Sequence, residues 1–352
     1  MVKRIVPGYG EEFLRREGLK SEVAVWEDGL RTDTGRGTFE WWYFDAHFDD
    51  GSTAVMVYAT KPLLLRGDAL TPMVTLTITR PDGVRLSSKP ILYSPNQFQA
   101  SKDGCQVRIG PSYVNGNLQK YELHTQGDQD WSANLVFTRV TPSWRPGSGM
   151  SYYDKSLEQY FAWLVPIPHG QVEGSLTYEG KTYPVRGIGY HDHNWGNFGL
   201  ETALDYWYWG RAHIGDFTVI FSEMTANNQY GRQKGSIFML AQGERLLADL
   251  GRAFTLETAD LTDHPSGKQY PRSLDFHWMG DKGTVDIALR QPHLIDSFSL
   301  LEDLPGWQRW LARRFVNPYY FRFNTEIALN VNLVDTRATQ RGSAIYELMM
   351  LH

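Results

Sequence analysis

The sequence predicts a mainly β protein made of two tandem antiparallel β domains, each a barrel or a sandwich, with a few short helices. Short β-branched runs recur about every ten residues, turn signals separate them, and one aromatic strand pattern occurs twice. The 352 residues suffice for two domains of ordinary size, and we place them at residues 1–198 and 199–352.

The expected strands follow one another along most of the chain. In the first half they are STAVMVYAT (52–60), MVTLTITRPDGVRL (73–86) and QVEGSLTYEGKTYPVRGIGYH (171–191), the last a hairpin turning at Glu179-Gly180. In the second half they are FTVIFSEM (217–224), GSIFMLAQGERLLADL (235–250), GTVDIALR (283–290) and TEIALNVNLVD (325–335). Helical periodicity is confined to EEFLRREG (11–18) and GWQRWLARRFVNP (306–318).

An internal echo links WWYFDAHFDDGSTAVMVY (41–58) to YWYWGRAHIGDFTVIFSEM (206–224). Trp42-Tyr43-Phe44 aligns with Trp207-Tyr208-Trp209, and Ala46-His47 aligns with Ala212-His213 after one gap. A spacing of about 165 residues is too long for a solenoid repeat and suits two copies of one β domain. We therefore expect residues 38–58 and 205–223 to occupy equivalent strands. The Gly/Pro-rich stretch 142–156 is either a lid or a long connection.

Composition excludes several functional classes. The net charge of -5 and scattered basic residues argue against a nucleic-acid partner. No apolar run approaches the ~18 residues of a spanning helix, and no apolar region follows the basic N-terminus as in a signal peptide. A lone cysteine, Cys105, rules out an internal disulfide, is interpreted as an inert strand residue, and favours a cytoplasmic location. Peripheral contact with a membrane is left open.

The stretch FEWWYFDAHF (39–48) sets a carboxylate among aromatic rings. On a strand, Glu40, Trp42 and Phe44 share one face, while Tyr43 and Asp45 lie on the other. Glu40 is therefore expected either at the rim of an apolar interior or buried with a partner such as Arg or Tyr. Without a partner, desolvation would raise the pKa of Glu40.

The densest chemical stretch is GIGYHDHNWGNFG (187–199). If it is extended, His191, His193 and Trp195 share one face, and Asp192 lies on the other with Tyr190. Three interpretations compete: a metal site, a structural turn in which glycines set the backbone, and an acid–base cluster in which Asp fixes the tautomer of a His. No third ligand has a recognisable spacing, so we expect no metal.

Four ordered motifs, FEWWYFDAHFDDG, GYHDHNWG, DYWYWGRAHIGDFTVIFSE and GSAIYELM, resemble the lipocalin-like family of carotenoid 1,2-hydratases (hydroxyneurosporene synthase). That family also includes kievitone-hydratase-like proteins and decalin-forming Diels–Alderases. The resemblance implies two tandem lipocalin-like barrels and chemistry that needs no cofactor. It also implies site roles for His193 and Trp195. Phe221 and Glu223 stand where the family places a Tyr and an Asp.

We therefore predict a cofactor-free enzyme acting on C=C bonds of a lipophilic polyene, an isoprenoid or a polyketide. Acid-catalysed hydration is the leading reaction, because a carboxylic acid among aromatic rings can protonate an alkene and the rings stabilise the cation. A polyene cyclase of the Diels–Alderase type and a non-catalytic carrier are the alternatives. The predicted catalytic residues are Glu223, His193 and Asp192, with Glu223 and His193 facing one aromatic cavity. The predicted substrate-binding residues are Trp42, Trp195, Trp207, Trp209, Phe221, Glu40 and Tyr190.

Overall fold

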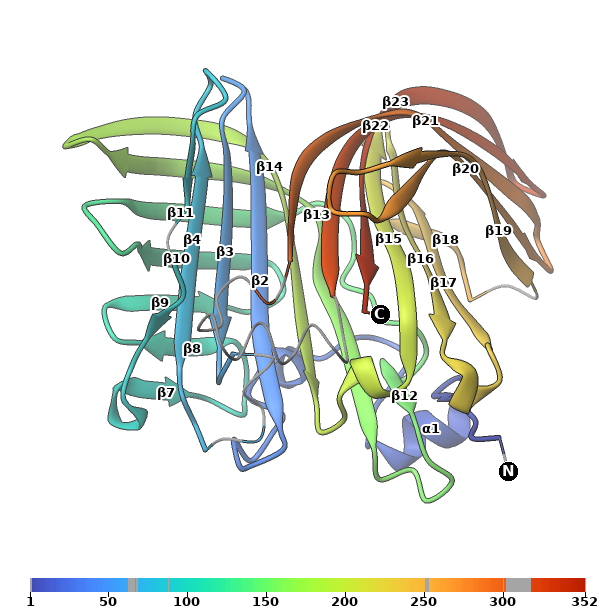
Figure 1. Cartoon of the computed structure of the whole chain (residues 1–352), viewed down its shortest axis with the longest axis horizontal. Coiled ribbons are helices and arrows are strands. Elements are labelled where there is room, and N and C mark those ends of the chain that lie inside the picture. Colours follow the sequence, from blue (N-terminus) through green and yellow to red (C-terminus); the bar gives the residue numbers. More distant parts are fainter. Residues whose placement is uncertain are drawn as a thin grey trace. The chain divides into compact units, whose positions relative to one another are not determined.

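The computed structural model describes residues 2–62, 67, 69–87, 89–250, 253–299, 301 and 318–351. They form two compact units: one is Val6–Phe198, and the other is Gly199–His352 together with Met1–Ile5. Each unit is built on one curled sheet in which all paired strands are antiparallel (Figure 1). The predicted mainly β, antiparallel fold with few helices is confirmed, and its two sheets are curled half-barrels.

The first unit carries a 14-stranded sheet whose main path runs β5-β4-β3-β2-β14-β13-β11-β10-β9-β8-β7. Its strands are β1 (Val6–Pro7), β2 (Phe39–Phe48), β3 (Thr53–Ala59), β4 (Met73–Thr79), β5 (Arg85–Ser87), β6 (Ile91–Leu92), β7 (Phe98–Ala100), β8 (Gln106–Ile109), β9 (Ser112–Gly116), β10 (Lys120–Gln126), β11 (Ser132–Arg139), β12 (Met150–Tyr152), β13 (Tyr160–Tyr178) and β14 (Lys181–Gly196). Its helical elements are α1 (Glu11–Arg16), η1 (Val25–Asp28) and η3 (Pro95–Gln97).

The second unit carries a nine-stranded sheet in the order β18-β17-β16-β15-β23-β22-β21-β20-β19. Its strands are β15 (Leu204–Ile214), β16 (Phe217–Ala226), β17 (Lys234–Gln242), β18 (Arg245–Asp249), β19 (Ala253–Asp263), β20 (Gln269–Gly280), β21 (Gly283–Ser299), β22 (Tyr319–Leu333) and β23 (Thr336–Met350). Two 3-10 turns, η4 (Leu200–Thr202) and η5 (Asn228–Tyr230), complete it.

The two sheets share one topology. In each, the first long strand pairs with the next strand in sequence and with the last strand of its unit: β2 with β3 and β14, and β15 with β16 and β23. The segments of the sequence echo, 38–58 and 205–223, therefore occupy equivalent strands. The central hairpin β13–β14 turns at Glu179 (φ 52°) and Gly180 (φ 72°), which is the pair of positive φ angles that a two-residue turn needs.

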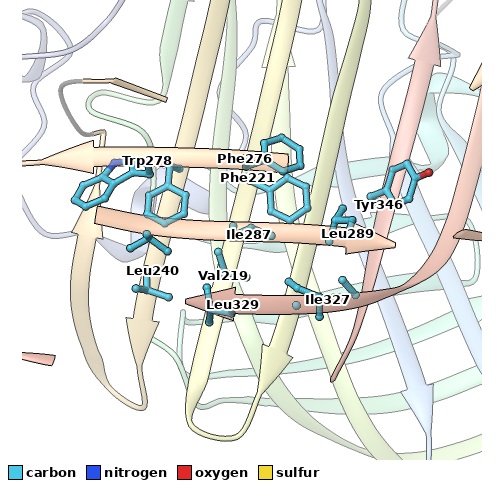
Figure 2. Close-up of a cluster of buried hydrophobic side chains, with 14 of the residues drawn as sticks. Val219, Phe221, Leu240, Phe276, Trp278, Ile287, Leu289, Ile327, Leu329 and Tyr346 are labelled. Atoms are coloured by element: carbon cyan, nitrogen blue, oxygen red, sulfur yellow. The ribbon is translucent and has the colours of Figure 1, made fainter. Parts of the chain in front are cut away.

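Strand alternation places the core of each unit on the inner face of its sheet. In β2, Trp42, Phe44 and Ala46 are fully buried, as the alternation predicts. In the second unit the corresponding core includes Phe221 and Phe276, whose ring centroids are 4.4 Å apart (Figure 2).

Two other expectations have definite outcomes. The stretch 11–18 forms the short helix α1, whereas the expected helix at 306–318 lies outside the described residues. Residues 142–156 are packed: β12 pairs with β1 and β13, and the buried Arg145 Nε lies 2.9 Å from Glu27 Oε2. This stretch is a connection held within the first unit.

Candidate functional site

The inner face of β2 and β14 stacks imidazole rings on aromatic rings. Antiparallel pairing sets His193 opposite Trp42 and His191 opposite Phe44. The stacked ring centroids are 4.6 Å apart for Trp42 and His193 and 3.8 Å apart for Phe44 and His191. Trp195 lies two residues after His193 on the same face of β14, and their ring centroids are 4.8 Å apart. The predicted face of His191, His193 and Trp195 is thus present, and both imidazoles are fully buried.

Glu40 is buried rather than at a rim. Its Oε1 accepts hydrogen bonds from the backbone N–H of Arg31 at 2.7 Å and from Nε2 of His193 at 2.8 Å. Its Oε2 accepts bonds from the backbone N–H and the hydroxyl of Thr32, both at 2.8 Å. Four hydrogen bonds therefore hold the buried Glu40 carboxylate in place.

Asp28, the last residue of η1, is the centre of the same network. Its Oδ2 accepts a 2.5 Å hydrogen bond from the Tyr121 hydroxyl and lies 3.2 Å from Nε2 of His191. Burial alone would raise the pKa of Asp28, but the contacts with His191 and His193 outweigh it and lower that pKa. Asp28 is therefore an ionised carboxylate inside the first unit.

The other groups around Asp28 are held in their protonated forms. Burial, with the Asp28 charge beside it, raises the pKa of Tyr121 and of Cys105 well above their ordinary values. Burial disfavours a charged His193, yet its contacts with Asp28 and Glu40 outweigh burial and raise the pKa of His193. Cys105, expected to be an inert strand residue, precedes β8 and lies beside Asp28 and His191 instead.

The opposite face of β14 carries a second polar cluster. Asp192 accepts hydrogen bonds from Trp163 Nε1 at 3.1 Å, the Tyr190 hydroxyl at 2.9 Å and Asn194 Nδ2 at 2.8 Å. Because successive side chains of a strand point to opposite faces, Asp192 lies away from His193. The carboxylates that contact His193 are Asp28 and Glu40.

The glycines of this stretch serve close approach rather than unusual dihedral angles. None of Gly187, Gly189, Gly196 and Gly199 has a positive φ. A Cβ on Gly187 would lie 2.0 Å from the carbonyl oxygen of His47 on the neighbouring strand. Glycine is therefore required where β14 packs against β2.

Glu223 belongs to the second unit and ends the inner face of β16. Phe217, Val219 and Phe221 precede it on that face and belong to the core of the unit, in which Figure 2 labels Val219 and Phe221. The Glu223 side chain is 3% exposed and pairs with Nζ of Lys234 at 2.8 Å, whereas the Lys234 side chain is 54% exposed. The contacts of each predicted catalytic residue lie within its own unit: His193 with Glu40 and Asp28, and Glu223 with Lys234.

The two tryptophans predicted on β15 lie on the face that points away from the core. Tyr208 and Ala212 belong to the core of the second unit, and Trp207 and Trp209 alternate with them. Both tryptophans are half-buried. The one-residue gap in the sequence echo explains this, because it inverts which residues face inward.

Sequence reasoning missed Asp28, Tyr121 and Thr32. Asp28 and Thr32 lie in the segment before β2, and Tyr121 lies on β10, far from either histidine in the sequence. No local spacing connects them, since only the folded sheet brings them together. The sole available signal was the acidic pair Glu27-Asp28 beside Trp26.

The family model of the Svf1 family matches residues 85–352, which is more than half of the chain. The chain belongs to the Svf1 family.

Relatives of this Svf1 family member include a binding protein and enzymes. Ceramide-binding protein svf1 of Aspergillus fumigatus is 22% identical over 61% of this chain and 57% of the relative. Hydroxyneurosporene dehydrogenase of Chlorobaculum tepidum is 26% identical over 50% of this chain and 53% of the relative. Quinolone epoxide rearrangement protein asqO of Emericella nidulans is 29% identical over 37% of each chain. The chain spans little more than half the length of the first two.

Solved structures show the same fold over nearly the whole chain. CghA with Sch210972 has a TM-score of 0.63 at 13% identity and covers 100% of this chain and 99% of its own. Kievitone hydratase from Nectria haematococca has a TM-score of 0.57 at 12% identity, covering 93% and 92%. The suspected resemblance to the lipocalin-like hydratase and Diels–Alderase group is confirmed. In the described part of the chain, no helix has the length and apolar character needed to cross a membrane.

Proposed function

We propose that this chain adds water across a C=C bond of a lipophilic polyene, an isoprenoid or a polyketide, with Glu223 as the proton donor. The observation that carries the proposal is a carboxylate, 3% exposed, that ends an apolar strand face and whose ion-pair partner is a half-exposed lysine. Relatives named a hydroxyneurosporene dehydrogenase and a quinolone epoxide rearrangement protein support an enzymatic role. The step needs no cofactor, because protonation of an alkene requires only an acid of suitable strength.

The surroundings of Glu223 suit the chemistry. Tyr208 lies directly across from it on β15, and Phe221 precedes it on the same face of β16. Burial, with Tyr206 and Glu223 nearby, raises the pKa of the Tyr208 phenol, so this ring stays neutral. A neutral aromatic face stabilises a cation by about 0.5–2 kcal/mol without quenching it as a base would.

Lys234 supplies the proton in this mechanism. The Lys234 ammonium passes one proton to the Glu223 carboxylate across their 2.8 Å contact. Glu223 then protonates one alkene carbon and leaves a carbocation on the other. Water adds to the cation, and the proton it loses returns to the Glu223 carboxylate. The substrate gains one water, and the enzyme is unchanged.

The roles predicted for His193 and Asp192 stay predictions, and the step at Glu223 does not depend on them. Both residues make their contacts within the first unit: His193 lies between two carboxylates, and Asp192 accepts three hydrogen bonds. Trp42 and Trp195 cover His193 there.

Mass spectrometry of carotenoid, terpenoid and polyketide polyenes after incubation with the chain tests the proposal. A gain of one water is the expected product. Glu223→Gln should retain substrate binding and lose the rate by about 10²–10⁴-fold, as expected for removal of a general acid. Glu257→Gln, at an exposed position of β19, is the matched control and should leave the rate unchanged.

A carrier of a ceramide-like lipid is the second candidate, favoured by membership of the Svf1 family and by a relative named for ceramide binding. If a lipid co-purifies with the chain and is released unaltered, and no polyene gives a product, the chain is a carrier rather than a hydratase. If the product is an isomer of unchanged mass but altered retention, and Glu223→Gln does not affect its formation, the reaction is cyclisation rather than hydration.

A further inference from the structure

The buried network of the first unit brings together three different metal-binding groups. Asp28, Cys105 and His191 each offer one ligand atom, and these atoms all lie within 4.8 Å of one another. All three residues are buried. Carboxylate oxygen, thiolate sulfur and imidazole nitrogen together are the ligand types of zinc sites in proteins.

The tautomer of His191 leaves a lone pair pointing at Asp28. Nδ1 of His191 lies 2.8 Å from the carbonyl oxygen of Tyr43, which can only accept, so Nδ1 carries the hydrogen. In a neutral ring, Nε2 is then an acceptor, yet it faces the Asp28 Oδ2 acceptor at 3.2 Å. Two acceptors at this distance need a positive charge between them, either a proton on Nε2 or a metal ion. Donation of the second ring nitrogen to a backbone carbonyl is also the usual support of a metal-bound histidine.

His193 repeats the pattern on the other oxygen of Asp28. Its Nε2 is 2.8 Å from Glu40 Oε1, and its Nδ1 is 3.2 Å from Asp28 Oδ1. Neither Nδ1 nor Oδ1 makes a hydrogen bond to any described residue, although both are buried. The Glu40 carboxylate therefore fixes the His193 ring with its Nδ1 beside Asp28.

We propose that Asp28, Cys105 and His191 bind one divalent ion of the zinc type. The Asp28 carboxylate and a Cys105 thiolate together offset the two charges of the ion. Binding forms the metal–sulfur bond and releases the thiol proton to solvent. Ligand atoms on one zinc lie about 3.5 Å apart, so the side chains close in by about 1 Å. The site lies in the first unit and does not rest on the function proposed for Glu223.

Elemental analysis and cobalt substitution of the full chain test this site. Protein purified without chelator should carry about one zinc per chain. After removal of that metal, Co²⁺ should produce a thiolate-to-cobalt charge-transfer band in the near ultraviolet. Zinc should raise the thermal midpoint of the metal-free protein by roughly 5 °C or more.

Variants separate this site from adventitious binding. Cys105→Ala should abolish the charge-transfer band, and His191→Gln should weaken Co²⁺ binding by about 10-fold or more. His124→Gln, at a histidine hydrogen-bonded to Asn134 on the surface, is the matched control and should bind as the unaltered chain does. If a variant fails to fold, the presence or absence of the cobalt charge-transfer band in the unaltered chain decides whether the site binds metal. A folded chain without zinc and without the cobalt band, or a Cys105→Ala variant that keeps the band, overturns the proposal.

Discussion

The two units share a strand order but differ in the side chains that their equivalent strands point into the core. With Ala46 set against Ala212, Glu40 corresponds to Tyr206, and Trp42 corresponds to Tyr208. The strand opposite Trp42 contributes His193, whereas the strand opposite Tyr208 contributes Leu348. One topology therefore holds an ionic network in the first unit and an apolar core in the second. Chemistry here is set by side chains rather than by strand order.

The difference depends on the segment before β2. Residues 25–32 bring Asp28 and the Thr32 donors onto the inner face, and Trp42 Nε1 donates to the carbonyl oxygen of Asp28 at 3.0 Å. In the second unit, the described residues directly before β15, from Gly199 to Ala203, form only the short η4. A polar interior requires a partner for every buried charge, and the first unit has the extra chain that supplies them.

The largest expected effect is loss of stability when the network loses one carboxylate. Glu40→Ala leaves the Thr32 donors and His193 without their acceptor and should cost about 3–5 kcal/mol of unfolding free energy. Tyr206→Phe, at the corresponding position, removes a hydroxyl without leaving a charge and should stay within about 0.5 kcal/mol. Urea denaturation followed by fluorescence measures both. If both variants lose the same small amount of unfolding free energy, the proposed contrast between the two units is wrong.

A smaller contrast is expected between two buried tyrosines. Tyr121 donates to the charged Asp28 at 2.5 Å, whereas Tyr346 donates to the carbonyl oxygen of Pro271 at 3.3 Å. Tyr121→Phe should cost about 1.5–3 kcal/mol and Tyr346→Phe about 0.5–1.5 kcal/mol, because bonds to charged groups are stronger. The same denaturation experiment compares them. A larger cost for Tyr346→Phe contradicts the assignment of the ionic network to the first unit.

The smallest expected effect is a pH dependence in the second unit. Burial lowers the pKa of His213, although Asp216 opposes this. The unfolded chain therefore binds a proton more readily than the folded one, so this contribution is complete above about pH 6.5 and declines as pH falls below it. Between pH 7 and 5.5 the urea midpoint should fall less in His213→Asn than in the unaltered chain. Parallel pH profiles would show that His213 does not contribute.

The sequence was sufficient for the strands, the turn at Glu179-Gly180 and the inner face of β2, because each depends on local alternation or turn chemistry. Alternation also placed His191, His193 and Trp195 on one face. The same rule sets Asp192, predicted to be catalytic, on the opposite face of β14 from His193.

The remaining site residues depend on tertiary structure. Asp28, Cys105 and Tyr121 come from three segments, and only strand pairing and the folding of the segment before β2 bring them to His191. The echo illustrates a second limit. The aromatic residues of the two segments align best with Trp42 matched to Trp207. The single gap, however, exchanges the inward and outward faces of the strand, so the residue that faces the core is Tyr208.

The docking of residues 2–5 in the second unit has a consequence for dividing the chain into separate domains. The backbone N–H of Lys3 donates to the carbonyl of Gln229, and that of Ile5 donates to the side chain of Gln233. The second unit is therefore discontinuous in sequence, and a chain shortened to Gly199–His352 would lose both of these hydrogen bonds.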